Sequence, residues 1–195
     1  FSTYSIPQIF IKGAPLILIA LGLSIGFKAN IWNIGAEGQY IMGAIFGASF
    51  ALYFYPLESN FIFPLMILTG IIGGSLWSMI PAILKVRFNV NEILVSLMLV
   101  YVAEQILALA SLGFLRNPDG AGFPGSRNLS QYSSASNSEL IMGTGIHLGV
   151  LLSLLMVVFF YVLLFQHSLG FKIKLLGKSP RASGFSGDNP NKIIF

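Results

Sequence analysis

The stretch GVLLSLLMVVFFYVLLF (residues 149–165) decides the fold class, because its seventeen positions are apolar except for one serine and one tyrosine. At about 1.5 Å of rise per residue, a helix of this length crosses most of a hydrocarbon core roughly 30 Å thick. A helix also pairs its own backbone groups, as a segment in lipid must. A strand of an outer-membrane barrel would alternate polar and apolar residues instead. The stretch therefore predicts a membrane-spanning helix and argues against a barrel.

Four further apolar segments precede this one, and the composition of the whole chain is that of a membrane protein. Hydrophobic residues make up 55% of the chain and charged residues 9%, with a mean hydropathy of +0.80. These values are far from the average of soluble proteins. We therefore predict an all-α, polytopic transmembrane helical bundle. Its five membrane segments are expected at residues 9–27, 31–55, 61–84, 91–115 and 146–166.

The chain is expected to be a single transmembrane domain over residues 1–195, incomplete at both ends. It begins with Phe1 and no initiator methionine, and another apolar run starts at residues 193–195. A fragment of a longer protein is the simplest explanation of these ends.

Positive charge is distributed unevenly between the two sets of connections, which must alternate across the membrane. One set carries eight Lys and Arg residues and the other carries three. Because cytoplasmic connections are enriched in positive charge, the first set is expected to be cytoplasmic. Residues 116–145 are then an external loop, and the residues after His167 are internal. The first set is Lys28, Lys85, Arg87, Lys172, Lys174, Lys178, Arg181 and Lys192, and the second is Lys12, Arg116 and Arg127.

The motif NIGAEGQ (residues 33–39) places a carboxylate, two amides and two glycines inside the second segment. An ionised carboxylate in hydrocarbon is costly unless it is paired, protonated or solvated in a cavity. Gly35 and Gly38 flank Glu37 and allow local unwinding, so we expect a helix broken at this motif. Asn33, Glu37 and Gln39, together with the two glycines, are candidates for a translocation pathway, with helix packing as the alternative.

The fourth segment carries two more acidic residues with different expected roles. Asn91 is expected to cap the helix and Glu92 to lie in its first turn, with Lys85 or Arg87 nearby. Glu104 lies near the middle of the segment and shares a face with Tyr101. Glu104 and Tyr101 are therefore candidates either for the pathway or for an interhelical hydrogen bond.

Two pairs of glycines at a spacing of four residues predict close helix packing. They are Gly43 with Gly47 in the second segment and Gly70 with Gly74 in the third.

Several classes of function are disfavoured by the residues. His147 and His167 stand 20 residues apart, about 30 Å along a helix, so they cannot share a metal ion and no metal site is expected. No Gly-x-x-x-x-Gly-Lys-Ser/Thr loop is present, so the chain is not expected to hydrolyse ATP. The basic residues lie beside apolar runs instead of forming a face interleaved with aromatics, which argues against nucleic acid. We predict that the chain is not an enzyme and needs no cofactor of its own.

The chain resembles the permease subunits of bacterial ATP-binding-cassette importers for nucleosides and simple sugars, which are related to ribose and branched-chain amino-acid permeases. Four separated stretches carry the resemblance, in the expected order and over nearly the whole chain. They are APLIL (14–18) leading into NIGAEGQ, KVRFNVNE (85–92) with Met98, Leu99 and Tyr101, GFP (122–124), and LGF (169–171) with GKSPRA (177–182).

The resemblance implies a multi-pass subunit of the bacterial inner membrane that forms the translocation pathway of an importer. It also implies that residues 168–192 are a cytoplasmic coupling segment that docks a separate ATPase, which binds the ATP. The expected partners are this ATPase, a second permease subunit and an extracytoplasmic substrate-binding protein, in addition to membrane lipid. The matching positions of the coupling segment are Gly170, Gly177, Pro180, Arg181, Ala182 and Gly187.

Two positions depart from the pattern of the resembling family. Val100 stands where asparagine is common, and Glu104 stands where an apolar residue is common, so the substrate stays open. An alternative function also stays open, in which Glu37 and Glu104 serve a proton- or cation-coupled secondary transporter or channel.

Overall fold

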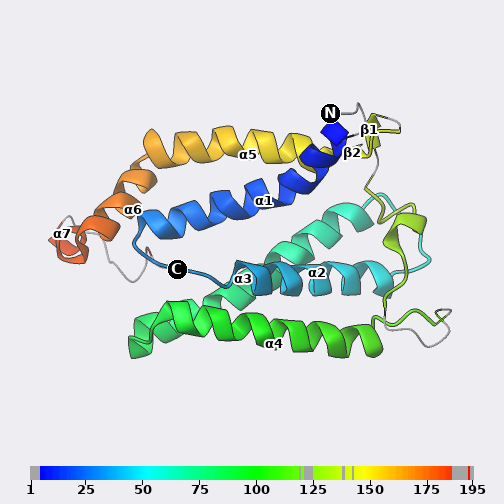
Figure 1. Cartoon of the computed structure of the whole chain (residues 1–195), viewed down its shortest axis with the longest axis horizontal. Helices are drawn as coiled ribbons and strands as arrows, with labels where there is room; N and C mark the ends of the chain where they lie inside the picture. The colour runs from blue at the N-terminus through cyan, green and yellow to red at the C-terminus, as the bar shows by residue number, and fades with distance from the viewer. Residues whose placement is uncertain are drawn as a thin grey trace. The chain divides into compact units, whose positions relative to one another are not determined.

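The computed structural model describes residues 5–118, 120, 125–137, 139–141, 143–185 and 193, and within them the chain is predominantly helical (Figure 1). This confirms the predicted all-α fold. A 3-10 turn and one short antiparallel pair of strands lie between the fourth and fifth helices. The elements are α1 (Ser5–Lys28), α2 (Ala36–Tyr53), α3 (Ile62–Phe88), α4 (Glu92–Leu112), η1 (Leu129–Gln131), β1 (Glu139–Ile141), β2 (Ile146–His147), α5 (Leu148–Phe165), α6 (Ser168–Lys178) and α7 (Pro180–Phe185).

Four helices in the described part of the chain are long and apolar enough to cross a membrane, namely Ile6–Lys28, α3, α4 and α5. The fifth expected segment is present as α2, but Glu37 and Gln39 in its first turns lower its hydropathy. Residues 31–35 are not helical, so the expected interruption lies at the start of the segment and the helix runs unbroken from Ala36.

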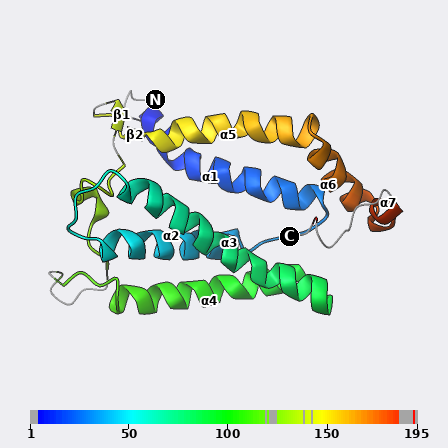
Figure 2. The ribbon, with the colours of Figure 1, turned by 180° about the vertical axis from the view of Figure 1, so that it is seen from behind.

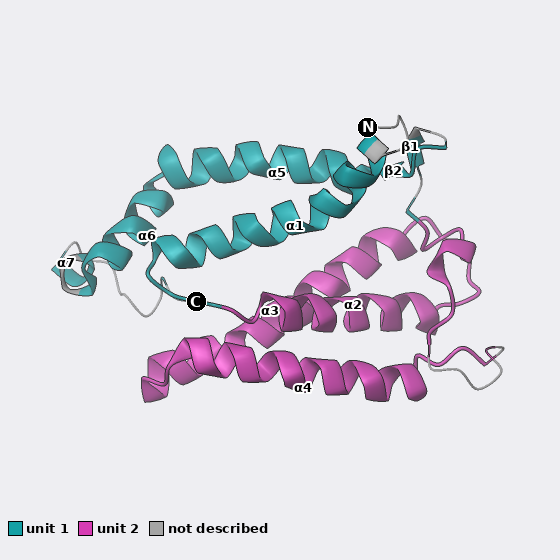
Figure 3. Cartoon of the chain, in the orientation of Figure 1, with its two compact units in different colours: residues 1–33, 137–195 teal, residues 34–136 magenta. Residues whose placement is uncertain are grey.

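The described helices group into two compact units (Figure 3). Residues 1–33 and 137–195 form unit 1, which contains α1, α5, α6 and α7. Residues 34–136 form unit 2, which contains α2, α3 and α4. The expected single domain over residues 1–195 stays a prediction.

In unit 2, α2 packs against both α3 and α4. A Cβ at Gly43 would lie 3.0 Å from the carbonyl oxygen of Gly70, and one at Gly74 would lie 3.2 Å from that of Gln39. The two backbones therefore touch along an antiparallel pair, as the glycine spacing predicts. On the other side of α2, an apolar core joins it to α4 and the residues that follow α4. This core is Met42, Ile45, Ala103, Ala110 and Leu115.

The described part of the expected external loop packs onto the connection between α2 and α3. Tyr132 is buried with Ala51 and Ile62, and its hydroxyl donates to the carbonyl oxygens of Phe54 and Leu57. The backbone N–H of Ser59 donates to Ser134 Oγ at 3.0 Å. This loop is therefore an ordered cap where the structure describes it.

Replacing Tyr132 with phenylalanine is expected to destabilise this cap by about 1 kcal/mol, because the hydroxyl no longer serves the two carbonyls. Burial raises the pKa of Tyr132, with smaller contributions from Glu58 and Tyr55. Because the pKa of Tyr132 is higher in the folded than in the unfolded protein, the neutral hydroxyl stabilises the fold fully below the unfolded-state pKa of about 10. This stabilisation is lost as the pH rises through the folded-state pKa. The difference in Tm between the wild type and Y132F should accordingly shrink above that pH. An unchanged Tm at neutral pH would contradict this role.

In unit 1, α1 and α5 lie side by side and run in the same direction, with α6 across their C-terminal ends (Figures 1 and 2). At their N-terminal ends, a Cβ at Gly145 would lie 3.0 Å from Ile11 Cδ1. At their C-terminal ends, Gly177 of α6 touches the backbone of Lys28. The shared direction places Lys28 at the same end of the unit as the lysines of α6.

Within each unit, the described cations of the two predicted sets lie at different ends, and which end faces the cytoplasm stays a prediction. In unit 2, Lys85 and Arg87 end α3 beside the starts of α2 and α4. Arg116 follows the far end of α4, and Arg127 lies over the Tyr55 ring in the α2–α3 connection. Each unit therefore has one end with the cations expected on the cytoplasmic side.

Candidate functional site

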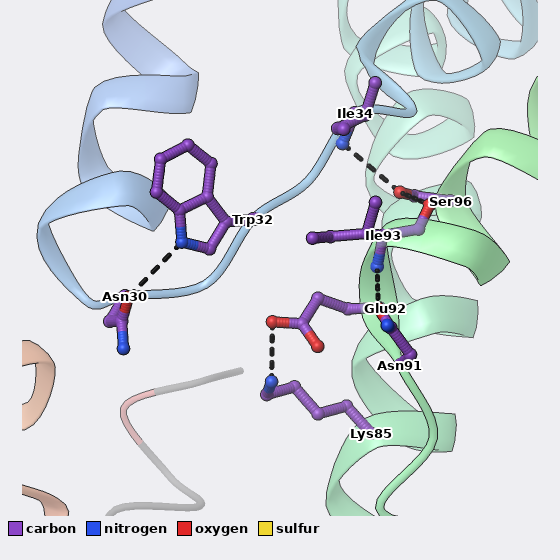
Figure 4. Close-up of polar contacts among 8 residues, drawn as sticks. All are labelled: Asn30, Trp32, Ile34, Lys85, Asn91, Glu92, Ile93 and Ser96. Atoms are coloured by element: carbon purple, nitrogen blue, oxygen red, sulfur yellow. Dashed lines mark hydrogen bonds and ion pairs between the residues drawn. The ribbon is translucent and has the colours of Figure 1, made fainter.

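A buried serine, Ser96, attaches the polar motif to the first turns of α4 (Figure 4). The backbone N–H of Ile34 donates to Ser96 Oγ at 3.2 Å, and Ser96 Oγ donates to the carbonyl of Ile93 at 3.1 Å. Ser96 is 2% exposed. A side-chain oxygen of α4 thus accepts a hydrogen bond from an N–H of the non-helical segment before α2, which has no helical partner of its own.

Gly35 is required where the chain crosses Ser96. A Cβ at Gly35 would lie 2.7 Å from the carbonyl oxygen of Ser96 and 2.9 Å from its Cβ. Both atoms are fixed to the α4 backbone and cannot swing away. The glycine therefore allows close approach between the motif and α4, in addition to any freedom that it gives the backbone.

Gly38 has a similar packing role inside the continuous helix α2. A Cβ there would lie 3.2 Å from Trp77 Nε1 of α3 and 3.2 Å from the Cα of Val100 of α4. The three helices of unit 2 therefore meet at this position. Trp77 Nε1 is buried and has no hydrogen-bond partner among the described residues.

Glu37 lies in the first turn of α2 and is exposed within its unit. A carboxylate in this position interacts favourably with the partial positive charge of the helix N-terminus. Gln39 is half-buried, and its carbonyl oxygen faces Gly74. Asn33 is half-buried in the non-helical segment before the helix. A pathway role for these residues stays a prediction.

Asn91 and Glu92 join the end of α3 to the start of α4, in agreement with the sequence prediction (Figure 4). Asn91 Oδ1 accepts a hydrogen bond from the backbone N–H of Ile93 at 3.0 Å. Lys85 Nζ lies 2.6 Å from Glu92 Oε1, and both side chains are partly shielded from solvent. This pair fixes the turn from which α4 presents Ser96.

Tyr101 and Glu104 lie on α4 away from the face that packs on α2. Tyr101 is 62% exposed, and Glu104 is exposed as well. Ala103, next to Glu104, packs in the core against Met42 of α2. Met42 lies more than one helical turn beyond Glu37. The structure therefore does not bring Glu37 and Glu104 together as a pair, and it leaves both on the open surface of unit 2.

The expected coupling segment begins as α6, which is attached to the ends of both long helices of unit 1. His167 Nδ1 accepts a hydrogen bond from the backbone N–H of Leu169 at 3.1 Å and caps the helix. A Cβ at Gly170 would overlap the carbonyl oxygen of Leu163 in α5, and a Cβ at Gly177 would overlap that of Lys28 in α1. These two glycines therefore allow α6 to pack directly against the backbones of α5 and α1.

The remaining residues of the coupling segment are placed only in part. Pro180 is the first residue of α7, and Arg181 and Ala182 follow in its first turn. Gly187 lies outside the described residues.

Sequence reasoning did not identify Ser96, Trp77 or the backbone partners of the two α6 glycines. A serine in the apolar helix α4, one turn after its capping asparagine, was a signal for a buried hydrogen bond. The contacts of Gly177 with Lys28 had no local signal, because the two residues are far apart in the sequence.

The apolar helices and their sorted charges define a multi-pass protein of the cell membrane. The chain belongs to the family described as the branched-chain amino acid transport system / permease component, which matches residues 5–195.

Three relatives illustrate this membership. The chain is 30% identical to the glucose ABC transporter permease protein TsgB13 of Haloferax volcanii, over 95% of the chain and 50% of that protein. It is 28% identical to the nucleoside ABC transporter permease protein NupB of Lactococcus lactis, over 99% of the chain and 54% of that protein. It is also 28% identical to the guanosine ABC transporter permease protein NupP of Bacillus subtilis, over 92% of the chain and 51% of that protein. The chain therefore spans about half the length of these relatives, and no solved structure matches it.

Proposed function

We propose that the full-length protein is the membrane-spanning subunit of an ATP-driven importer of nucleosides or simple sugars. The observation that carries this proposal is the family match over residues 5–195. The names of the relatives, which refer to glucose, nucleoside and guanosine transport, support the substrate class. In this function the chain moves a solute and carries out no bond chemistry.

We place the docking surface for a separate ATPase on α6 and α7. α6 presents Leu169 and Phe171, which are 50% and 66% exposed, near its start and the exposed Lys178 at its end. Its glycine contacts attach it to α1 and α5, so a movement of α6 is passed directly to two long helices. ATP is bound by the ATPase, and a second permease subunit and an extracytoplasmic substrate-binding protein complete the assembly.

The function is tested by uptake of labelled guanosine and labelled glucose in cells that lack their own carriers. The cells express the full-length protein together with an ATPase, a second permease and a binding protein from the same organism. Uptake of one of the two solutes is expected, and it should disappear when the ATPase is replaced by a variant that cannot hydrolyse ATP. Uptake that persists with the inactive ATPase would overturn the proposal.

Glu37→Gln is expected to reduce ATP-dependent uptake only modestly, without changing its dependence on the proton gradient. The reason is that Glu37 is an exposed first-turn residue of α2, where a carboxylate contributes about 0.3–1 kcal/mol through the helix dipole. Uptake is measured with and without a protonophore at constant ATP, and Glu104→Gln is the matched second variant. Loss of solute-coupled proton movement in E37Q would instead favour the secondary transporter.

A further inference from the structure

Two lysines from different helices converge on one aromatic ring in unit 1. Lys28 Nζ, at the end of α1, lies 5.0 Å from the centroid of the Phe165 ring, and Lys174 Nζ of α6 lies 4.3 Å from it. Phe165 is the last residue of α5. Both lysines are half-buried. The contact of α6 with α1 and α5 thus builds a cationic cluster, defined here as Lys28, Lys174 and Phe165.

The cluster lies where two candidate membrane spans end, since Lys28 and Phe165 are the last residues of those spans. Aromatic side chains gather at the same place. Trp32 packs on Phe27 with ring centroids 5.1 Å apart, and Tyr161 stacks on Phe165 at 5.2 Å. Aromatic residues with lysine are typical of the boundary between hydrocarbon and lipid headgroups. We therefore place the cluster at headgroup level.

Acidic side chains do not neutralise this cluster within the described part of unit 1. The acidic residue described there is Glu139 of β1, which belongs to the opposite ends of α1 and α5. Lys172 and Lys178 add further positive charge along α6. Two ammonium groups held near one ring repel each other, and an anion between them would remove that repulsion.

We propose that the cationic cluster binds the phosphate of an anionic phospholipid, such as phosphatidylglycerol, in the leaflet where α1 and α5 end. Charge complementarity favours an anion, and the surrounding apolar surface favours one that carries acyl chains over free phosphate. Tyr161 and Phe165 of α5 are 56% and 57% exposed and offer contacts for such chains. The site is independent of the transport proposal, because it needs only the membrane and this unit.

The test uses the full-length protein in phosphatidylcholine vesicles that contain a small fraction of photoactivatable phosphatidylglycerol. Crosslinked peptides are mapped by mass spectrometry. Labelling is expected at the ends of α1 and α5 and in α6 near Lys174. The double substitution K28Q/K174Q should weaken it about fivefold per lysine, and about 25-fold in total at subsaturating lipid. K28R/K174R should restore it, and K12Q, which removes an exposed lysine from the other end of α1, should leave it unchanged.

Four outcomes would overturn the proposal. The first is equal labelling of the wild type and K28Q/K174Q, with folding of both verified by circular dichroism. The second is displacement of the lipid by excess inorganic phosphate, which would identify a soluble anion as the ligand. The third is equal labelling by a phosphatidylcholine probe, which would show a surface without headgroup preference. Weaker binding of the ATPase to K28Q/K174Q with lipid labelling unchanged would likewise assign the cluster to the ATPase.

Discussion

Gly177→Ala in the full-length protein is expected to abolish most ATP-driven uptake while leaving the protein in the membrane. The added Cβ would overlap the carbonyl oxygen of Lys28, which belongs to the backbone of α1 and cannot rotate away. α6 must then move away from its packed position against α1. Overpacking of this kind costs typically about 1–3 kcal/mol, so the population with α6 in place falls by roughly five- to 150-fold.

The chain offers a matched control for this variant in Gly149 of α5. A Cβ at Gly149 meets no atom within 4 Å, so Gly149→Ala should leave uptake nearly unchanged. Uptake, surface expression and the ATPase activity of the assembled complex are measured for both variants. Hydrolysis that continues in G177A without uptake would show that α6 links the two processes. Normal uptake by G177A would refute the close packing of α6 against the backbone of Lys28.

At α6, the local sequence pattern predicts where the charges lie but not how the glycines pack. The position of Lys172, Lys174 and Lys178 after the last apolar helix was sufficient to predict which end of unit 1 they occupy. Gly170 and Gly177 were expected at a surface that binds the ATPase. The structure adds an intramolecular reason for both glycines, namely contact with backbone carbonyls of α5 and α1. Such pairings join distant residues, so no periodicity within α6 could reveal them.

The polar motif shows the same limit. Hydropathy predicted the long helices because burial in lipid depends on each segment by itself. Hydropathy could not predict that α2 starts at Ala36. That start depends on Ser96, which lies 62 residues from Ile34 in the sequence and whose hydroxyl oxygen accepts a hydrogen bond from the Ile34 N–H. The helix cap formed by Asn91 was easier to predict, since its hydrogen-bond partner Ile93 is only two residues away.

Gly35→Ala is expected to destabilise the full-length protein more than any other single methyl addition in the motif. Its Cβ would approach the carbonyl oxygen of Ser96 to 2.7 Å, whereas that of Gly38→Ala would be no closer than 3.2 Å to a neighbouring atom. We expect a loss of about 3 kcal/mol for Gly35→Ala, at the upper end of the range for overpacking, and a smaller loss for Gly38→Ala. The Tm of each purified variant in one detergent measures this order.

Ser96→Ala separates the packing of Gly35 from the hydrogen bond beside it. It deletes the acceptor of the Ile34 N–H but leaves the α4 backbone in place, so a loss of about 1–3 kcal/mol is expected from the unpaired group. Gly22→Ala in α1 is the control, because its Cβ would meet no atom within 4 Å. If G35A retains the Tm of G22A, the motif is not held against Ser96. If G35A and S96A both unfold more easily, the start of α2 depends on α4, and any solute that passes the motif moves along a helix positioned by this contact.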